Sequence, residues 1–143
     1  MTKTLTLDTA LDLVGKHPYS GSVEDIVTLS STISQSKKQF NKSVYKIFTE
    51  KSNIDPKIYS NLKKIGDRMD TLPIDVKQEV CRSFPPHYRT IYNICSLKPE
   101  EIKTAVKKKT ITKNMSYRES DYLVKQIRFP SKLVTENDKG RWS

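Results

Sequence analysis

Cysteine and glycine are scarce in this chain of 143 residues, and their placement excludes two classes of site. The two cysteines, Cys81 and Cys95, lie too far apart for the close pairs that are typical of zinc and thioredoxin-like sites, so we expect buried free thiols. The four glycines are scattered along the chain. A loop that cradles phosphate groups needs clustered glycines, so nothing in the sequence supports nucleotide hydrolysis.

Histidine chemistry is restricted to two residues, His17 and His87. Neither lies near cysteines or carboxylates at metal-ligand spacing, so we expect no metal site and no cofactor. A nucleophilic serine or cysteine would need one of these histidines as its base, and the chain has no serine flanked by glycines in a nucleophile elbow. We therefore expect no catalytic residue, no enzyme activity and no small-molecule substrate.

Long hydrophobic runs are also missing. No apolar stretch approaches the roughly 20 residues that cross a bilayer, and the N-terminal segment lacks a signal pattern. The mean hydropathy is −0.64, yet the apolar residues recur at helical spacing. We expect a cytoplasmic protein without membrane contact.

Positive charge, in contrast, is abundant. Lys and Arg total 26 against 16 Asp and Glu, which gives a formal net charge of +10. Such an excess favours binding to a polyanion, above all a nucleic acid, through counterion release. The same net charge could serve solubility alone or reflect a lysine-rich genome. The arrangement of the charges along the chain therefore has to distinguish these explanations from nucleic-acid binding.

Helical periodicity predicts an all-α fold, a compact multi-helix bundle that contains a helix-turn-helix and has flexible termini. We expect a flexible N-terminal arm over residues 1–21, with at most one docked turn. A helical DNA-binding domain follows over 22–128, with the helix-turn-helix at about 38–66 and a second helical subregion at about 84–127. Residues 129–143 are expected to form a flexible tail.

Several residues mark expected helix boundaries. Ser22 followed by Asp25 is a capping box that opens a helix, and the same pattern recurs at Ser116. Val23, Ile26, Val27 and Ile33 fall on one face of the helix that Ser22 opens, and the polar stretch at 30–36 precedes the next apolar stripe. Gly66 is expected to end the second helix of the helix-turn-helix.

The segment 38–66 contains each part that a helix-turn-helix needs. The supporting helix has an apolar stripe formed by Phe40, Val44, Ile47 and Phe48. Ile54 can fill the turn, and Asp55 followed by Pro56 is a typical helix start. The second helix is expected to pack inward through Ile58, Leu62 and Ile65.

The opposite side of this helix pair is then directed outward, and we expect it to contact DNA. Its cations and polar groups can neutralise phosphates and hydrogen-bond base edges, and no acidic residue follows Asp55 on this outer surface. Residues 37–68 contain nine Lys or Arg against three acids. An ordinary solvated helical hairpin would have the same pattern. The expected DNA-binding residues are Lys42, Lys46, Lys57, Tyr59, Ser60, Asn61, Lys63 and Lys64.

A second basic group lies in the 84–127 subregion and is a further candidate for phosphate contact. The alternative is that lysines at a helix end only complement the helix dipole. The group consists of Lys107, Lys108, Lys109, Lys113 and Arg118.

Three phrases of the sequence resemble a known family. KKQFNKSVYKIFTEKSNIDPKIYSNLKKIG (37–66), FPPHYRTIYNI (84–94) and TKNMSYRE (112–119) are similar to the helix-turn-helix modules of phage and plasmid proteins, including ParB- and KorB-like proteins. The resemblance implies DNA binding. Asp55 and Pro56 depart from the small hydroxyl residues usual at this point, and no nuclease or nucleotide-binding segment is present, so partition activity is not implied.

These observations together predict a sequence-specific double-stranded DNA-binding protein, a transcriptional regulator of a bacterium, phage or plasmid. One helix-turn-helix buries little surface, so we expect a homodimer or higher multimer on DNA, formed through the 84–127 helices. Two alternatives stay open. One is a basic helical adaptor for an acidic protein partner, and the other is a non-specific binder of RNA or single-stranded DNA.

Overall fold

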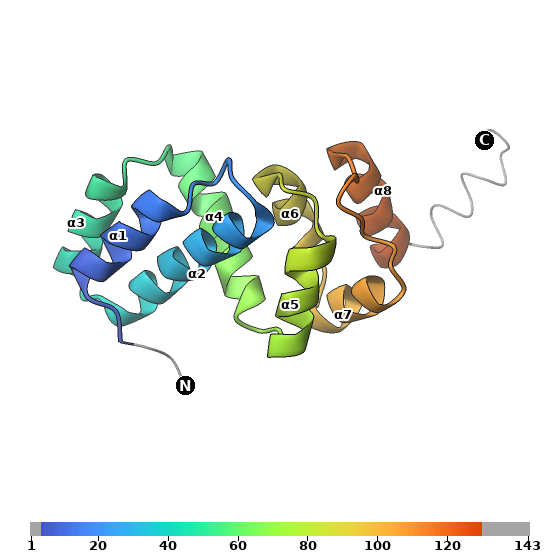
Figure 1. The fold of residues 1–143 in the computed structure, drawn as a ribbon, viewed down its shortest axis with the longest axis horizontal. Coiled ribbons are helices and arrows are strands. Elements are labelled where there is room, and N and C mark those ends of the chain that lie inside the picture. The colour runs from blue at the N-terminus through green and yellow to red at the C-terminus, as the bar shows by residue number, and fades with distance from the viewer. Residues whose placement is uncertain (1–3, 130–143) are drawn as a thin grey trace, which may run out of the picture.

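A computed structural model describes residues 4–129 of the chain. In this part every regular element is an α-helix, which confirms the all-α prediction (Figure 1). The expected tail falls outside the described residues from position 130 onward. The helices are α1 (Leu7–Lys16), α2 (Val23–Gln39), α3 (Lys42–Ser52), α4 (Pro56–Met69), α5 (Ile74–Ser83), α6 (Tyr88–Ile94), α7 (Pro99–Lys107) and α8 (Tyr117–Arg128).

Side-chain caps set the start of several helices as the sequence predicts. The Ser22 hydroxyl accepts a hydrogen bond from the Asp25 amide, and the Asp25 carboxylate accepts one from the Ser22 amide, both at 3.1 Å. Ser116 and Glu119 form the same reciprocal pair at the start of α8. Each such cap stabilises a helix by about 1 kcal/mol, because it satisfies amide groups that no helical carbonyl can reach.

The N-terminal segment differs from the expected arm, since it contains the ten-residue helix α1. The Thr6 hydroxyl caps this helix by accepting from the Thr9 amide at 3.1 Å. Ala10 is fully buried, and α1 packs against both α2 and α3. An apolar phrase too short to fold alone thus becomes helical because two neighbouring helices cover it. Its other inward residues are Leu7, Leu11 and Val14.

The polar stretch at residues 30–36 lies inside α2, which continues through it to Gln39. Its serines are small side chains at a close helix crossing, and Ser30 and Ser34 are completely buried. The matching position on α4 is Gly66, where a β-carbon would lie only 2.1 Å from the Ser30 carbonyl oxygen. The prediction that Gly66 ends its helix is therefore wrong. This glycine sits inside α4 and permits the crossing.

Polar contacts join α2 to the C-terminal half of α4. The Ser34 hydroxyl donates to Asp67 at 2.6 Å, while the Gln35 amide and the Lys38 ammonium donate to Asp70 at 2.7 and 3.2 Å. Burial alone would raise the pKa of Asp67, but hydrogen bonds from Ser34 and Lys63 hold that pKa below its ordinary value. Asp67 of α4 and Asp70, which caps the C-terminus of this helix, are thereby engaged in the fold.

Helices α5 to α8 form the other half of the molecule, with α4 between the two halves (Figure 1). Leu72, Val76 and Val80 are buried in this half. α6 packs against α4 on one side and α8 on the other. Both cysteines are free, as predicted, with Cys95 buried and Cys81 only half-buried.

Candidate nucleic-acid interface

The turn between α3 and α4 is set by three residues within positions 53–56. Asn53 adopts the left-handed conformation, with φ of 54°, which a helix commonly uses to end. The Asp55 carboxylate accepts a hydrogen bond from the Lys57 amide at 2.9 Å, and Pro56 occupies the first helical position. Because proline lacks an amide hydrogen, it suits a position where that hydrogen would have no helical partner. The predicted interruption between the two helices is therefore present.

The inward face of α4 is as the sequence predicts. Leu62 and Ile65 are fully buried, and Ile58 packs partly buried against the same core. Ile54, the predicted filling of the turn, also packs against this core. The direction of these side chains leaves the opposite side of α4 to solvent.

The inward face of α3 is rotated from the predicted one. Phe48 is fully buried, but Ile47 is 40% exposed, so its prediction as an inward residue is wrong. Tyr45 turns inward in its place, with its ring centroid 6.2 Å from that of Phe48. A large aromatic residue can cover the core edge with its ring while its hydroxyl reaches a polar partner, which isoleucine cannot do.

Tyr45 and Tyr59 join α3 to α4 directly. The Tyr59 hydroxyl donates to the Tyr45 hydroxyl oxygen at 2.7 Å, and the ring centroids are 6.4 Å apart. Burial first, and this hydrogen bond second, raise the pKa of Tyr59 above its ordinary value. The Tyr59 hydroxyl, predicted as a DNA contact, is thus occupied within the protein.

On the outer side of α4 the predicted residues divide into two groups. Lys57, Ser60 and Lys64 are exposed and lie at i, i+3 and i+7, whereas Asn61 is half-buried. Lys63 is paired with Asp67 at 3.0 Å, and the Asp67 side chain is 42% exposed. The expectation that no acid follows Asp55 on this surface is therefore wrong. On this outer side of α4 the uncompensated cations are Lys57 and Lys64, for which residues 4–129 offer no ion pair.

The predicted phosphate contacts of α3 line a hollow of about 530 Å³. Lys42 and Lys46 are both exposed there, and Lys37, at the end of α2, places its ammonium 4.8 Å from the centroid of the Tyr45 ring. Sequence reasoning counted Lys37 as local charge but did not name it as a contact, because only the crossing of α2 over α3 brings it here. We call this hollow, lined by Lys37, Lys42, Ser43, Tyr45, Lys46 and Thr49, the lysine hollow.

The second basic group lies at the other end of the molecule, on α7 and α8 and the chain between them (Figure 1). All five of its members are exposed. The Lys113 ammonium donates to the Cys81 carbonyl at 3.1 Å, so it is partly committed to the fold. Lys109 has a φ of 58°, which marks the end of α7. The group is thus separate from the lysine hollow and does not extend it.

Comparison with protein-family models, with curated proteins and with solved structures finds no match to this chain. The resemblance to ParB- and KorB-like modules stays a prediction from the quoted phrases. Within residues 4–129 no helix has the length and apolar character to span a bilayer. The same residues contain no group of three or more His, Cys, Asp or Glu side chains that could hold a metal ion.

Proposed function

We propose that this chain binds double-stranded DNA through α3 and α4, as a sequence-specific transcriptional regulator of a bacterium, phage or plasmid. One observation carries the proposal: exposed lysines of α3 and α4, and one exposed lysine in the last turn of α2, have no ion pair among residues 4–129, and the Tyr45–Tyr59 hydrogen bond fixes α3 and α4 relative to each other. Lysines that serve only solubility would not require the helices that carry them to be fixed relative to each other. The lysines concerned are Lys37, Lys42, Lys46, Lys57 and Lys64.

The two helices would have different tasks on DNA. The lysine hollow neutralises backbone phosphates, which supplies affinity without sequence preference. The exposed Ser60 and half-buried Asn61 on α4 hydrogen-bond base edges in the major groove, which supplies specificity. Lys57 and Lys64 flank them and orient the helix against the phosphates. Lys63 contributes less, because Asp67 already neutralises it.

We further propose that two or more copies occupy the DNA together. A single helix of this kind buries too little surface for tight specific binding, so half-sites are usually paired. Within the 84–127 region, α8 exposes the aromatic side chains Tyr117 and Tyr122 at 51% and 46%. Exposed aromatic residues are enriched at protein interfaces, which supports this region as the contact between copies.

The test is a fluorescence-anisotropy titration of the full chain at two salt concentrations. The probes are the duplex upstream of its own gene, a random duplex and a single strand. Lys42→Gln with Lys46→Gln should weaken duplex binding and reduce the slope of log affinity against log salt by roughly 2, since each phosphate contact contributes about 0.9. Lys57→Ala with Lys64→Ala should act alike. The charge-matched control is Arg82→Gln with Lys103→Gln, two exposed positions on α5 and α7.

Other outcomes would point to other functions. Equal affinity for all three nucleic acids would assign a non-specific binder. Absence of nucleic-acid binding, together with an acidic protein partner that survives nuclease treatment, would assign an adaptor. If both double-lysine variants bind the duplex as tightly as the parent chain at both salt concentrations, α3 and α4 are not the DNA-contacting surface.

A further inference from the structure

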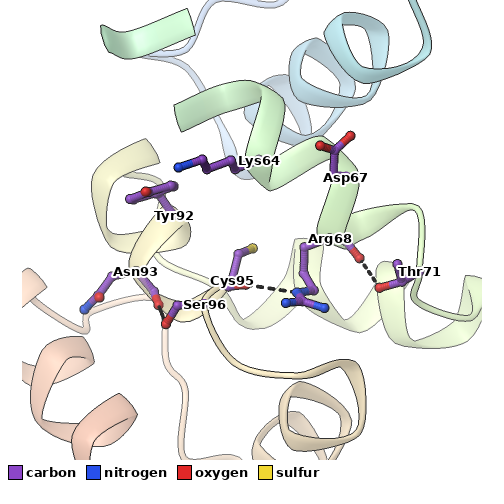
Figure 2. A pocket seen from close by; sticks show the side chains of 8 residues that line it. All are labelled: Lys64, Asp67, Arg68, Thr71, Tyr92, Asn93, Cys95 and Ser96. Atoms are coloured by element: carbon purple, nitrogen blue, oxygen red, sulfur yellow. Dashed lines mark hydrogen bonds between the residues drawn. The ribbon is translucent and has the colours of Figure 1, made fainter. Parts of the chain in front are cut away.

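Two cations line the cavity between α4 and α6, and neither is paired with a carboxylate among residues 4–129 (Figure 2). Its volume is about 470 Å³, which is within the range of small-molecule sites. Lys64 and Arg68 line it from α4, and Tyr92 lines it from α6. None of its lining residues was predicted as part of a binding pocket, and Lys64 was predicted only as a DNA contact.

Arg68 is held in a fixed orientation at one end of this cavity. Its Nε donates a hydrogen bond to the Cys95 carbonyl at 3.0 Å, which leaves the two terminal nitrogens of the guanidinium without a partner among residues 4–129. The residue is half-buried. A guanidinium removed from water is costly unless an anion compensates it, and its planar fork matches a phosphate with two parallel hydrogen bonds.

Lys64 and Tyr92 lie toward the other end of the cavity in Figure 2, with the ammonium 5.9 Å from the centroid of the tyrosine ring. The one carboxylate among the lining residues belongs to Asp67. It already accepts hydrogen bonds from Ser34 at 2.6 Å and Lys63 at 3.0 Å, and in Figure 2 it points away from the Arg68 guanidinium. The charges of Lys64 and Arg68 therefore stay uncompensated.

Three neutral polar side chains of the cavity, Thr71, Asn93 and Ser96, are already used as donors. Thr71 donates its hydroxyl hydrogen to the Arg68 carbonyl, and Ser96 donates to the Asn93 carbonyl at 2.7 Å. The Asn93 amide donates to Ser120 at 3.1 Å. Hydrogen-bond donors for a ligand therefore come mainly from the two cations. Such a donor set selects a ligand with several negatively charged oxygens over a neutral polar one.

We propose that this cavity binds a phosphoryl group, with the Arg68 guanidinium as the two-pronged contact and the Lys64 ammonium as the second charge. The phosphoryl group belongs either to a small ligand of about mononucleotide size or to a nucleic-acid backbone. Because Lys64 also lies on the proposed DNA-contacting surface, a small ligand in the cavity would compete with DNA for this lysine. The proposal does not require that DNA binding be correct, since Arg68 and Tyr92 stand outside that surface.

The test is NMR titration of the isotope-labelled full chain with inorganic phosphate, adenosine monophosphate and a short random duplex, each separately. We expect the signals of the Arg68 side chain, Tyr92 and Cys95 to move. Arg68→Gln should weaken binding of whichever probe moves these signals by about tenfold, which is the equivalent of one charge-assisted contact. Arg82→Gln, an exposed arginine on α5 that is paired with Glu79, is the matched control and should leave binding unchanged.

The probes distinguish the two sources of phosphate. Movement with phosphate or adenosine monophosphate assigns a small ligand, and movement with the duplex alone assigns the nucleic-acid backbone. Lys64→Gln, at an exposed position, provides a second variant if Arg68→Gln does not fold. The proposal is overturned if none of the probes moves these signals, or if folded Arg68→Gln and Lys64→Gln both bind as tightly as the parent chain. Loss of duplex binding in Lys42→Gln with Lys46→Gln, without loss of phosphate binding, would separate this site from the proposed function.

Discussion

Gly66 in α4 packs directly on the backbone of Ser30 in α2, where an added β-carbon would lie 2.1 Å from the Ser30 carbonyl oxygen. No side chain fits in that space without moving one helix away from the other. The crossing places α4 in the middle of the molecule, with its inward residues against α2 and its outer side in solvent. The orientation of the proposed DNA-contacting helix thus depends on a contact made on its opposite side.

Gly66→Ala is expected to destabilise the protein. Alanine favours a helix by up to about 1 kcal/mol over glycine, but the overpacking at this crossing costs about 1–3 kcal/mol and the obstacle is backbone. Chemical denaturation measures the difference. The matched control is Gly15→Ala in α1, where nothing lies within 4 Å of the added carbon and no loss is expected. If Gly66→Ala is as stable as the parent chain or more stable, α2 and α4 do not cross closely enough to exclude a β-carbon at this position.

Tyr45→Phe is expected to reduce both stability and DNA affinity. It removes the acceptor of the 2.7 Å hydrogen bond and leaves the partly buried Tyr59 hydroxyl unsatisfied, which costs about 1–3 kcal/mol. Since no charge is removed, the salt dependence of DNA binding should keep its slope while the affinity falls. Denaturation and anisotropy titrations measure the two effects. Tyr19→Phe, at a half-buried position between α1 and α2 whose hydroxyl has no hydrogen-bond partner among residues 4–129, should change neither. A loss of slope in Tyr45→Phe would contradict a purely positioning role.

Asp67 is expected to make stability depend on acidic pH. Hydrogen bonds from Ser34 and Lys63 outweigh burial and hold its folded-state pKa below the ordinary value. A lowered folded pKa contributes stability that is present above the unfolded pKa of about 4 and is lost as the pH falls through the folded pKa. Asp67→Asn should therefore be less stable than the parent near neutral pH, and the difference should shrink below about pH 4. Denaturation curves at several pH values measure it, and a difference that grows on acidification would reverse the assignment.

The two cysteines are expected to differ in reactivity. Burial raises the pKa of Cys95 to about 12, whereas Cys81 is half-buried and its pKa is also raised by burial. Because the thiolate is the reactive form, iodoacetamide at mildly alkaline pH should modify Cys81 slowly and Cys95 only after unfolding. Mass spectrometry of peptides from folded and denatured protein measures the two rates. Modification of both thiols at the same rate in folded protein would contradict the buried position of Cys95.

Local sequence patterns determined where several helices begin and which residues of α4 turn inward. The Ser22 and Ser116 caps, the Asp55–Pro56 start and the Leu62–Ile65 face depend on contacts within a few residues, so the sequence encodes them directly. Hydrophobic periodicity likewise determined the all-helical class. A helix with apolar residues along one face needs only some neighbouring surface to bury that face.

Only the tertiary structure decided the remaining features. Whether Gly66 ends a helix, and whether Tyr45 or Ile47 faces the core, both depend on which helix lies opposite. The same holds for the meeting of Arg68 and Tyr92 at one cavity. These contacts join residues on different elements or choose among competing local partners, and their energies exist only once the chain has packed.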